Sequence, residues 1–329
     1  MPKYSVITGF IGQTKDRFHT YNEQRDLDEK LQVVTEIPGY SGVEVVYPYE
    51  TRDPDVLTKL LSKHGLEVST INVNVKGEPE FVSGGITSPK PEVRKKAIGF
   101  IKESMDFASA VGVNRVTCCP LGDGFEFPFQ TDYRQAWTHL CDAFGEAASY
   151  REEINLHIEY KPKETRRHCF VNRAADTLCL IRDIGAKNLG VTIDYGHSIY
   201  AGEHPAESLS MLHYSGQPYY IHINDNDKTW DWDFFTGSHT LLEYIEFVFY
   251  MKQFGYDDYV TTDTHPTRWD MKRMFEINAR LTEKVWSLLD RVGMDEIRKL
   301  IDNEDYPTTW HFIETNILGT YTLLEAARQ

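Results

Sequence analysis

Two patterns of apolar and polar positions alternate along the chain up to residue 292. Short apolar runs rich in β-branched and aromatic residues predict strands, and longer segments with apolar residues at helical spacing predict helices. The eight predicted strands cover residues 4–11, 42–48, 67–75, 114–120, 155–162, 189–195, 219–225 and 258–264. The eight predicted helices cover residues 27–37, 53–65, 91–112, 132–153, 172–185, 205–215, 239–254 and 270–292.

Strict alternation of strand and helix is typical of parallel strands joined by helical crossovers. Eight such units in a row, with no linker or change of composition between them, match the (β/α)8 barrel. A doubly wound sheet is the alternative. We therefore predict an α/β fold with a single TIM barrel over residues 1–293 as the catalytic domain, followed by a C-terminal helical extension over residues 294–329.

Polar residues share one face of the last four predicted strands. In the strand NLHIEYKP (155–162), side chains alternate with period two, so His157, Glu159 and Lys161 fall on the same face. Active sites of such barrels lie at the carboxyl ends of the strands. The equivalent polar positions at the ends of predicted strands five to eight are Glu159, Asp194, His222 and Asp263.

Three carboxylates and one imidazole form a hard, oxygen-rich ligand set. Such a set suits a divalent ion, with Mn²⁺ expected first and Mg²⁺ or Co²⁺ as alternatives, and it differs from the cysteine-rich sets of structural zinc sites. Each residue alone could be an ordinary polar strand end. Burying all four together without a cation would be strongly unfavourable, so the pattern predicts a metal site.

Composition and charge narrow the class of partner. The chain has 329 residues, 41% of them hydrophobic, and a formal net charge of −15. A protein that follows phosphate backbones normally carries a basic stripe, so we expect no nucleic-acid partner. The five cysteines include no CxxC pair, and no apolar run is long enough to span a bilayer. We therefore expect a cytoplasmic protein that does not bind membranes and acts on a small molecule.

In these strand-end residues the chain resembles the xylose isomerase-like TIM barrels, a superfamily of metal-dependent sugar isomerases and epimerases that also contains the endonuclease IV branch. The resemblance covers residues 4–292 and rests on the motifs EYKP, IDYGHS, HINDN and TTDTHP. It implies that one metal is bound by Glu159, Asp194, His222 and Asp263.

The resemblance leaves the branch of the superfamily open. Ketose 3-epimerases carry Glu on both strand five and strand eight, whereas strand eight here offers Asp263, which is one methylene shorter. The spacing of acidic and histidine residues is closer to rhamnose isomerase, which implies a second metal held by His197, Asp231 and Asp233. Trp230 interleaves with these aspartates, so the loop is alternatively a wall of the substrate site.

Moving hydrogen between adjacent carbons of a sugar requires a Lewis acid, plus either a base for proton transfer or a second cation for hydride shift. We expect proton transfer. The predicted catalytic residues are Glu159, Lys161, Asp263 and His197. The predicted substrate-binding residues are Trp230, His265, Phe127 and Asn224. Lys161 alternatively lies solvated at the rim, and His265 and His157 alternatively pack without a catalytic role.

Three functions follow from these expectations. The first is a metal-dependent sugar isomerase or epimerase, which we expect to be a homo-oligomer. The second is a lyase, such as the catalytic subunit of a C-glycoside deglycosidase, which cleaves an oxidised (3-keto) glycoside with a small partner subunit. The third is a nuclease or a noncatalytic sugar-binding barrel. The acidic net charge disfavours the nuclease, and the intact ligand set disfavours the noncatalytic barrel.

Overall fold

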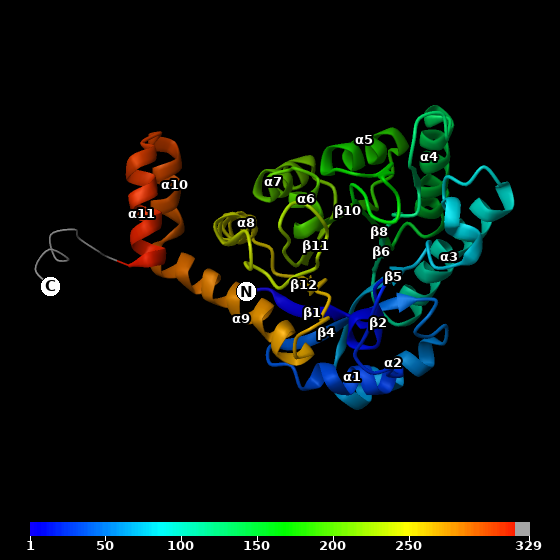
Figure 1. Cartoon of the computed structure of the whole chain (residues 1–329), viewed down its shortest axis with the longest axis horizontal. Helices are drawn as coiled ribbons and strands as arrows, with labels where there is room; N and C mark the ends of the chain where they lie inside the picture. The colour runs from blue at the N-terminus through cyan, green and yellow to red at the C-terminus, as the bar shows by residue number, and fades with distance from the viewer. Residues whose placement is uncertain (320–329) are drawn as a thin grey trace, which may run out of the picture.

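Residues 1–319, which the computed structural model describes, form a closed barrel of eight parallel strands surrounded by helices (Figure 1). The barrel strands are β1 (Lys3–Ile7), β4 (Tyr40–Tyr47), β5 (Glu67–Val73), β6 (Arg115–Cys118), β8 (Asn155–Glu159), β10 (Leu189–Asp194), β11 (Tyr219–Ile223) and β12 (Tyr259–Thr262). Strand β1 closes the barrel by pairing in parallel with both β4 and β12. The predicted TIM barrel is confirmed.

The helices around the barrel begin and end within a few residues of their predicted ranges. They are α1 (Leu27–Thr35), α2 (Pro54–His64), α3 (Pro91–Ala110), α4 (Tyr133–Tyr150), α5 (Ala174–Ile184), α7 (Pro205–Ser215), α8 (Leu241–Gln253) and α9 (Met271–Val292). Helix α2 shows the local cause of this agreement. The side chain of Asp53 accepts hydrogen bonds from the first turn, Pro54 starts the helix, and Gly65 ends it at a φ of 67°.

Several short elements at the barrel mouth were not predicted, because two to six residues carry no readable periodicity. They are the strands β2 (Thr14–Lys15), β3 (Thr20–Tyr21), β7 (Gly124–Phe125) and β9 (His168–Cys169), the helix α6 (Tyr195–Tyr200), and the 3₁₀ turns η1 (Thr8–Ile11) and η2 (Pro79–Ser83). Strands β7 and β9 pair with each other. This pair joins the loop after β6 to the loop after β8, next to the strand ends that carry the predicted site.

The interior of the barrel below those strand ends is filled by polar and aromatic side chains. The hydroxyl groups of Tyr220 and Ser5 both lie 2.6 Å from the hydroxyl of Thr261. His157 stacks on Tyr220 with ring centroids 6.2 Å apart, and burial lowers the pKa of His157 to about 3. His157 is therefore a packed, neutral histidine, as one of the two expectations held.

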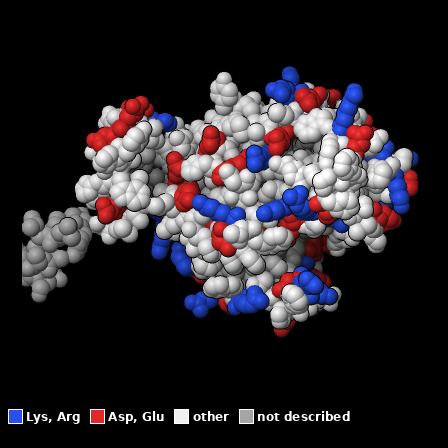
Figure 2. All heavy atoms as spheres, turned by 45° about the horizontal axis from the view of Figure 1, so that its top comes forward, with Lys and Arg blue, Asp and Glu red and all other residues white. Residues whose placement is uncertain are grey.

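Two further helices, α10 (Met294–Asn303) and α11 (Tyr306–Leu318), extend from the end of α9 and project away from the barrel (Figure 1). The predicted helical extension is thus confirmed as far as residue 318, and residues 320–329 of that prediction lie outside the described residues. Within residues 1–319, no helix combines the length and the apolar character that crossing a membrane requires. On the face displayed in Figure 2, acidic and basic side chains are intermingled over the surface.

Gly190 on β10 provides a test of the packing inside the barrel. A Cβ at this position would overlap the imidazole of His157 and the carbonyl oxygen of Pro218, both of which are fixed. We expect Gly190→Ala to lower the free energy of unfolding by about 1–3 kcal/mol, because overpacking a dense core forces its neighbours to shift. Chemical denaturation would measure the change.

Gly99→Ala is the matched control, because Gly99 lies inside α3 and a Cβ there would meet no atom within 4 Å. That substitution should raise stability by up to about 1 kcal/mol through helix propensity. Equal stability of the Gly190→Ala variant and the unchanged protein would contradict the described packing.

Candidate metal centre

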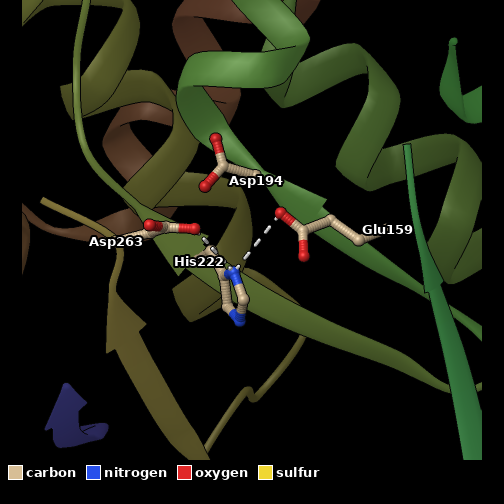
Figure 3. Close-up of side chains that lie close together, drawn as sticks. All are labelled: Glu159, Asp194, His222 and Asp263. Carbon is tan, nitrogen blue, oxygen red and sulfur yellow. Dashed lines mark ion pairs between the residues drawn. The ribbon is translucent and has the colours of Figure 1, made fainter. Parts of the chain in front are cut away.

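The four predicted ligands converge at the carboxyl ends of four strands. Glu159 ends β8, Asp194 ends β10, His222 lies one residue before the end of β11, and Asp263 follows β12 directly. The parallel register pairs Asp194 with His222. One ligand atom from each residue lies within 4.8 Å of the others, and all four residues are buried. Figure 3 shows the three carboxylates and the imidazole pointing toward one another.

The donor set fits a divalent cation. Nδ1 of His222 faces the carboxylates, 3.4 Å from Oδ2 of Asp263 and 3.7 Å from Oε1 of Glu159. This nitrogen is buried and makes no hydrogen bond within the described part of the chain. Three buried carboxylates repel one another unless a positive charge lies between them. Among residues 1–319, this is the one group of His, Cys, Asp and Glu whose ligand atoms approach so closely.

Asp194 is held by a network that joins two of the sequence motifs. Its Oδ1 caps α6 by accepting a hydrogen bond of 2.8 Å from the backbone N–H of His197. Its Oδ2 accepts a hydrogen bond of 3.2 Å from the amide of Asn224, whose own oxygen accepts one from the backbone N–H of Gly196. A Cβ at Gly196 would overlap that amide. The glycine of IDYGHS is therefore required for contact with HINDN.

His222 is oriented from its other side by a residue that the sequence did not single out. Its Nε2 lies 3.0 Å from Oε2 of Glu44 on β4, and both side chains are completely buried. The one available signal was a charged residue in the middle of the apolar strand GVEVVYP. That signal gives no information about the partner of Glu44, which is 178 residues away in sequence.

Two of the three residues predicted for a second metal, His197 and Asp231, form ion pairs. His197 lies between two carboxylates, with Nδ1 at 3.2 Å from Oε1 of Glu159 and Nε2 at 3.1 Å from Oδ2 of Asp231. The ammonium of Lys161 is 2.7 Å from the same oxygen of Asp231 and also pairs with Glu164. In the described residues, His197, Asp231 and Asp233 do not form a group of closely spaced ligand atoms.

The pKa values of the metal-free site follow from burial and charge. Burial raises the pKa of Asp194 to about 7. Burial alone would lower the pKa of His197, but Asp194 and Asp231 outweigh it and raise that pKa to about 9. Burial likewise opposes a charged His222, yet Glu44 and Glu159 raise its pKa well above the ordinary value. Protons thus supply positive charge among the carboxylates of the metal-free protein.

A cavity of about 930 Å³ lies over the cluster. Four predicted catalytic residues line it, namely Glu159, Lys161, His197 and Asp263. Another part of its wall is apolar and includes Ile7, Phe10, Val46, Phe81, Val82 and Leu121. The site therefore combines a charged floor with an apolar wall, so that it can receive a molecule with a polar and an apolar part.

Of the four predicted substrate-binding residues, only His265 lines this cavity. Asn224 is completely buried, and its amide also lies 3.2 Å from Asp233. Trp230 is 40% exposed and packs edge-on against Tyr200, and Phe127 is 59% exposed. Neither aromatic residue borders the cavity. The sequence could not predict the direction of these two side chains, because the loops that carry them have no periodicity.

Comparison with known proteins gives one family and several similar folds. A sequence model described as "Xylose isomerase-like TIM barrel" matches residues 31–285. Xylose isomerase of Thermus thermophilus is 26% identical over 229 residues, which are 67% of this chain and 59% of that protein. Xylose isomerase of Allorhizobium ampelinum is 25% identical over 174 residues, or 51% of this chain and 40% of that protein. The chain thus matches less than two thirds of the length of these relatives.

Solved structures of similar fold have lower identity. A structure of L-ribulose 3-epimerase superimposes with a TM-score of 0.70 at 16% identity and covers 89% of this chain and 98% of its own. The structure of 3-keto-D-glucoside 4-epimerase from E. coli gives a TM-score of 0.68 at 16% identity, with 86% and 100% covered. A structure of IOLI protein with a bound zinc atom gives 0.62 at 16% identity, with 88% and 97% covered. At these identities the likeness shows a shared fold.

The ligand set predicts the effect of single substitutions on metal binding. We expect Glu159→Gln or His222→Ala to weaken binding of Mn²⁺ roughly a hundredfold or more, because each removes a ligand from a buried site. Metal content after dialysis against chelator and reloading would measure this. The control Glu152→Gln changes an exposed glutamate before β8 and should bind metal normally. Full metal content in both ligand variants would contradict the assignment.

The pKa values predict that metal affinity rises with pH. Metal ligands must be deprotonated, and in the metal-free protein Asp194 keeps a proton below about pH 7 while His222 keeps one to higher pH. We therefore expect affinity to fall by about tenfold per pH unit for each displaced proton as pH drops from 8 to 6. Calorimetric titration in buffers of different ionisation enthalpy would count the released protons. A constant affinity over this range would contradict the prediction.

Proposed function

The chain belongs to the family of xylose isomerase-like TIM barrels, and from this premise we propose that it is a divalent-metal-dependent sugar isomerase or epimerase. The observation that carries the proposal is the buried cluster of Glu159, Asp194, His222 and Asp263 under a cavity of about 930 Å³. Two proteins of similar fold, an L-ribulose 3-epimerase and a 3-keto-D-glucoside 4-epimerase, support the same class of reaction. We propose Mn²⁺ as the metal, because the ligand set is mainly carboxylate oxygen.

The reaction that we propose is proton transfer at a carbon next to a sugar carbonyl. A divalent cation bound by the four residues would polarise that carbonyl and so acidify the neighbouring C–H. Glu159 accepts the proton from carbon, and the electron pair left behind is delocalised into an enediolate. Return of the proton to the adjacent carbon completes an isomerisation when the proton of the neighbouring hydroxyl also passes to the original carbonyl oxygen. For an epimerisation, a protonated Asp263, which comes from β12 rather than β8, gives its own proton to the opposite face of the same carbon, and Glu159 keeps the proton that it removed.

Neighbouring side chains position these groups. His197 lies 3.2 Å from Oε1 of Glu159 and holds that carboxylate toward the cavity. Lys161 lines the cavity and is itself fixed by Asp231, so we propose that it donates a hydrogen bond to a substrate oxygen. Asn224 contacts Asp194 and is proposed to orient this ligand, and His265 is proposed as a substrate contact. Trp230 and Phe127 are proposed to act only on parts of a substrate that extend beyond the cavity.

The ion pairs around Asp231 favour proton transfer over hydride shift. A second cation at His197, Asp231 and Asp233 would have to displace the ammonium of Lys161, which is 2.7 Å from Asp231. The second cation would also lie beside His197. Burial lowers the pKa of His197, but Asp194 and Asp231 raise it to about 9, so this side chain carries a positive charge. Both conditions add repulsion between positive charges. One metal per chain is therefore part of the proposal.

A second candidate function is the lyase or C-glycoside deglycosidase, acting on an oxidised glycoside with a small partner subunit. The size and lining of the cavity favour it. A volume near 930 Å³ is at the upper end of the range for pockets that enclose drug-sized ligands. The apolar wall of Phe10, Phe81 and Leu121 suits an aromatic aglycone attached to the sugar. Activity on an oxidised glycoside, without conversion of free sugars, would establish this candidate.

We further propose that residues 1–293 form the catalytic domain and that residues 294–329 form an extension through which copies of the chain associate. Helices α10 and α11 bury none of their residues, and Trp310 and Leu318 are 57% and 80% exposed. Exposed apolar surface of this kind is typical of association sites. We also propose that the protein is cytoplasmic, that its substrate is a carbohydrate, and that it binds neither nucleic acid nor membranes.

Turnover in heavy water tests the chemical route. The Mn²⁺-loaded protein would be offered a panel of ketoses, aldoses and C-glycosides, and each product analysed by mass spectrometry and NMR. We expect conversion of a free sugar with deuterium at the carbon that undergoes exchange, because a carboxylate proton exchanges with solvent before it returns. Metal analysis should give one ion per chain.

The metal-free protein is the control and should show no conversion. A product free of deuterium, together with two metals per chain, would instead establish a hydride shift and refute the proposed route.

A further inference from the structure

The strands that supply no metal ligand contribute a buried carboxylate to the metal centre. Glu44 lies in the middle of β4, on the side of the barrel away from β8, β10, β11 and β12, and its side chain is completely buried. Its Oε2 is 3.0 Å from Nε2 of His222. A charged group inside a barrel is costly to bury unless it is hydrogen-bonded. The burial of Glu44 therefore depends on partners such as His222.

The contact fixes which nitrogen of His222 carries the hydrogen. A carboxylate accepts hydrogen bonds and donates none, so once His222 gives up a proton to act as a ligand, the hydrogen that remains lies on Nε2, beside Glu44. The lone pair of Nδ1 then remains free, and Nδ1 is the atom that faces Glu159 and Asp263. Nδ1 is also the nitrogen without a hydrogen-bond partner in the described residues. The tautomer set by Glu44 is therefore the one that a metal ligand needs.

Glu44 is itself held in place by the two neighbouring strands. Its Oε1 accepts a hydrogen bond of 2.7 Å from the amide of Asn72 on β5 and one of 2.8 Å from the hydroxyl of Thr117 on β6. Asn72 is 8% exposed and Thr117 is completely buried. One carboxylate oxygen of Glu44 thus accepts the hydrogen bonds that hold this side chain, and the other oxygen contacts His222.

From this geometry we propose that Glu44 is a positioning residue of the metal centre, which selects the tautomer and ring orientation of His222 and strengthens it as a ligand. The negative charge of Glu44 next to the Nε2–H group increases the electron density on Nδ1, which makes Nδ1 a stronger ligand for a metal. Through Asn72 and Thr117, the strands β4, β5 and β6 hold a ligand that belongs to the other side of the barrel. The inference rests on the metal binding in the proposed function and is independent of the sugar reaction.

The test compares metal affinity and tautomer in substituted proteins. Glu44→Gln removes the charge at nearly constant volume, and we expect it to weaken binding of Mn²⁺ and Co²⁺ tenfold to a hundredfold, measured by competition with a chelator. Thr117→Val removes one hydrogen bond to Glu44 and should weaken binding by a smaller factor. Long-range ¹H–¹⁵N spectra of the metal-free protein, recorded at a pH where His222 is neutral, should show His222 protonated at Nε2, and a second tautomer should appear in Glu44→Gln.

Asp123→Asn is the matched control. Asp123 is also a buried carboxylate, 1% exposed, but it accepts its hydrogen bonds from Thr87, away from the ligands. This variant should bind metal with unchanged affinity, although its folding is perturbed in a comparable way. Circular dichroism of every variant would confirm the fold before titration.

Three outcomes decide the inference. Unchanged metal affinity in folded Glu44→Gln, or loss of affinity equal to that in Asp123→Asn, would overturn the role of Glu44. A single Nε2-protonated tautomer in Glu44→Gln would overturn the tautomer argument. If the unchanged protein binds metal and Glu44→Gln does not, the role of Glu44 stands even when no sugar on the panel is converted. Failure of the inference about Glu44 can therefore be told apart from failure of the proposed sugar reaction.

Discussion

The repulsion among three buried carboxylates is the constraint on which the rest of this structure depends. Glu159, Asp194 and Asp263 lie with one imidazole in a space small enough for every ligand atom to be within 4.8 Å of the others. Charges of one sign this close in a protein interior are tolerated only beside positive charge. In the metal-free protein that charge comes from protonated histidines, and a divalent cation supplies it more strongly. The cluster thus has the character of a divalent-metal site.

The barrel meets this constraint by holding three of the four residues through contacts with neighbouring side chains. Asp194 caps α6 and is held by Asn224, which in turn requires a glycine at position 196. His222 contacts Glu44, and Glu159 contacts His197. These neighbours restrict the orientations of Asp194, His222 and Glu159, which would lower the cost of ordering the site around a cation. The motifs IDYGHS and HINDN therefore hold each other in place, in addition to supplying Asp194 and His222 to the cluster.

The substrate side of the site has a different character. Lys161, His197 and Asp231 form a charged chain on one side of the cavity, while Phe10, Phe81 and Leu121 form an apolar wall. The charged chain accounts for how Lys161 can be buried at 7% exposure and still carry its charge. The apolar wall accounts for the breadth of possible substrates, because it can pack against a sugar carbon chain or against an aglycone. In the proposed function, the charged chain would therefore govern the reaction and the apolar wall the choice of substrate.

The pattern of the sequence was enough to predict the barrel and the four residues of the buried cluster. Eight apolar runs alternating with eight amphipathic segments define parallel strands, and the period of two in each strand places Glu159, Asp194, His222 and Asp263 at one rim. Only the tertiary structure decided that Glu44 contacts His222, that Asp231 pairs with Lys161, and that Trp230 lies outside the cavity. The reason is that strand periodicity is local and survives in the sequence. Contacts between residues 178 positions apart, and side-chain directions in loops without periodicity, exist only after the barrel closes.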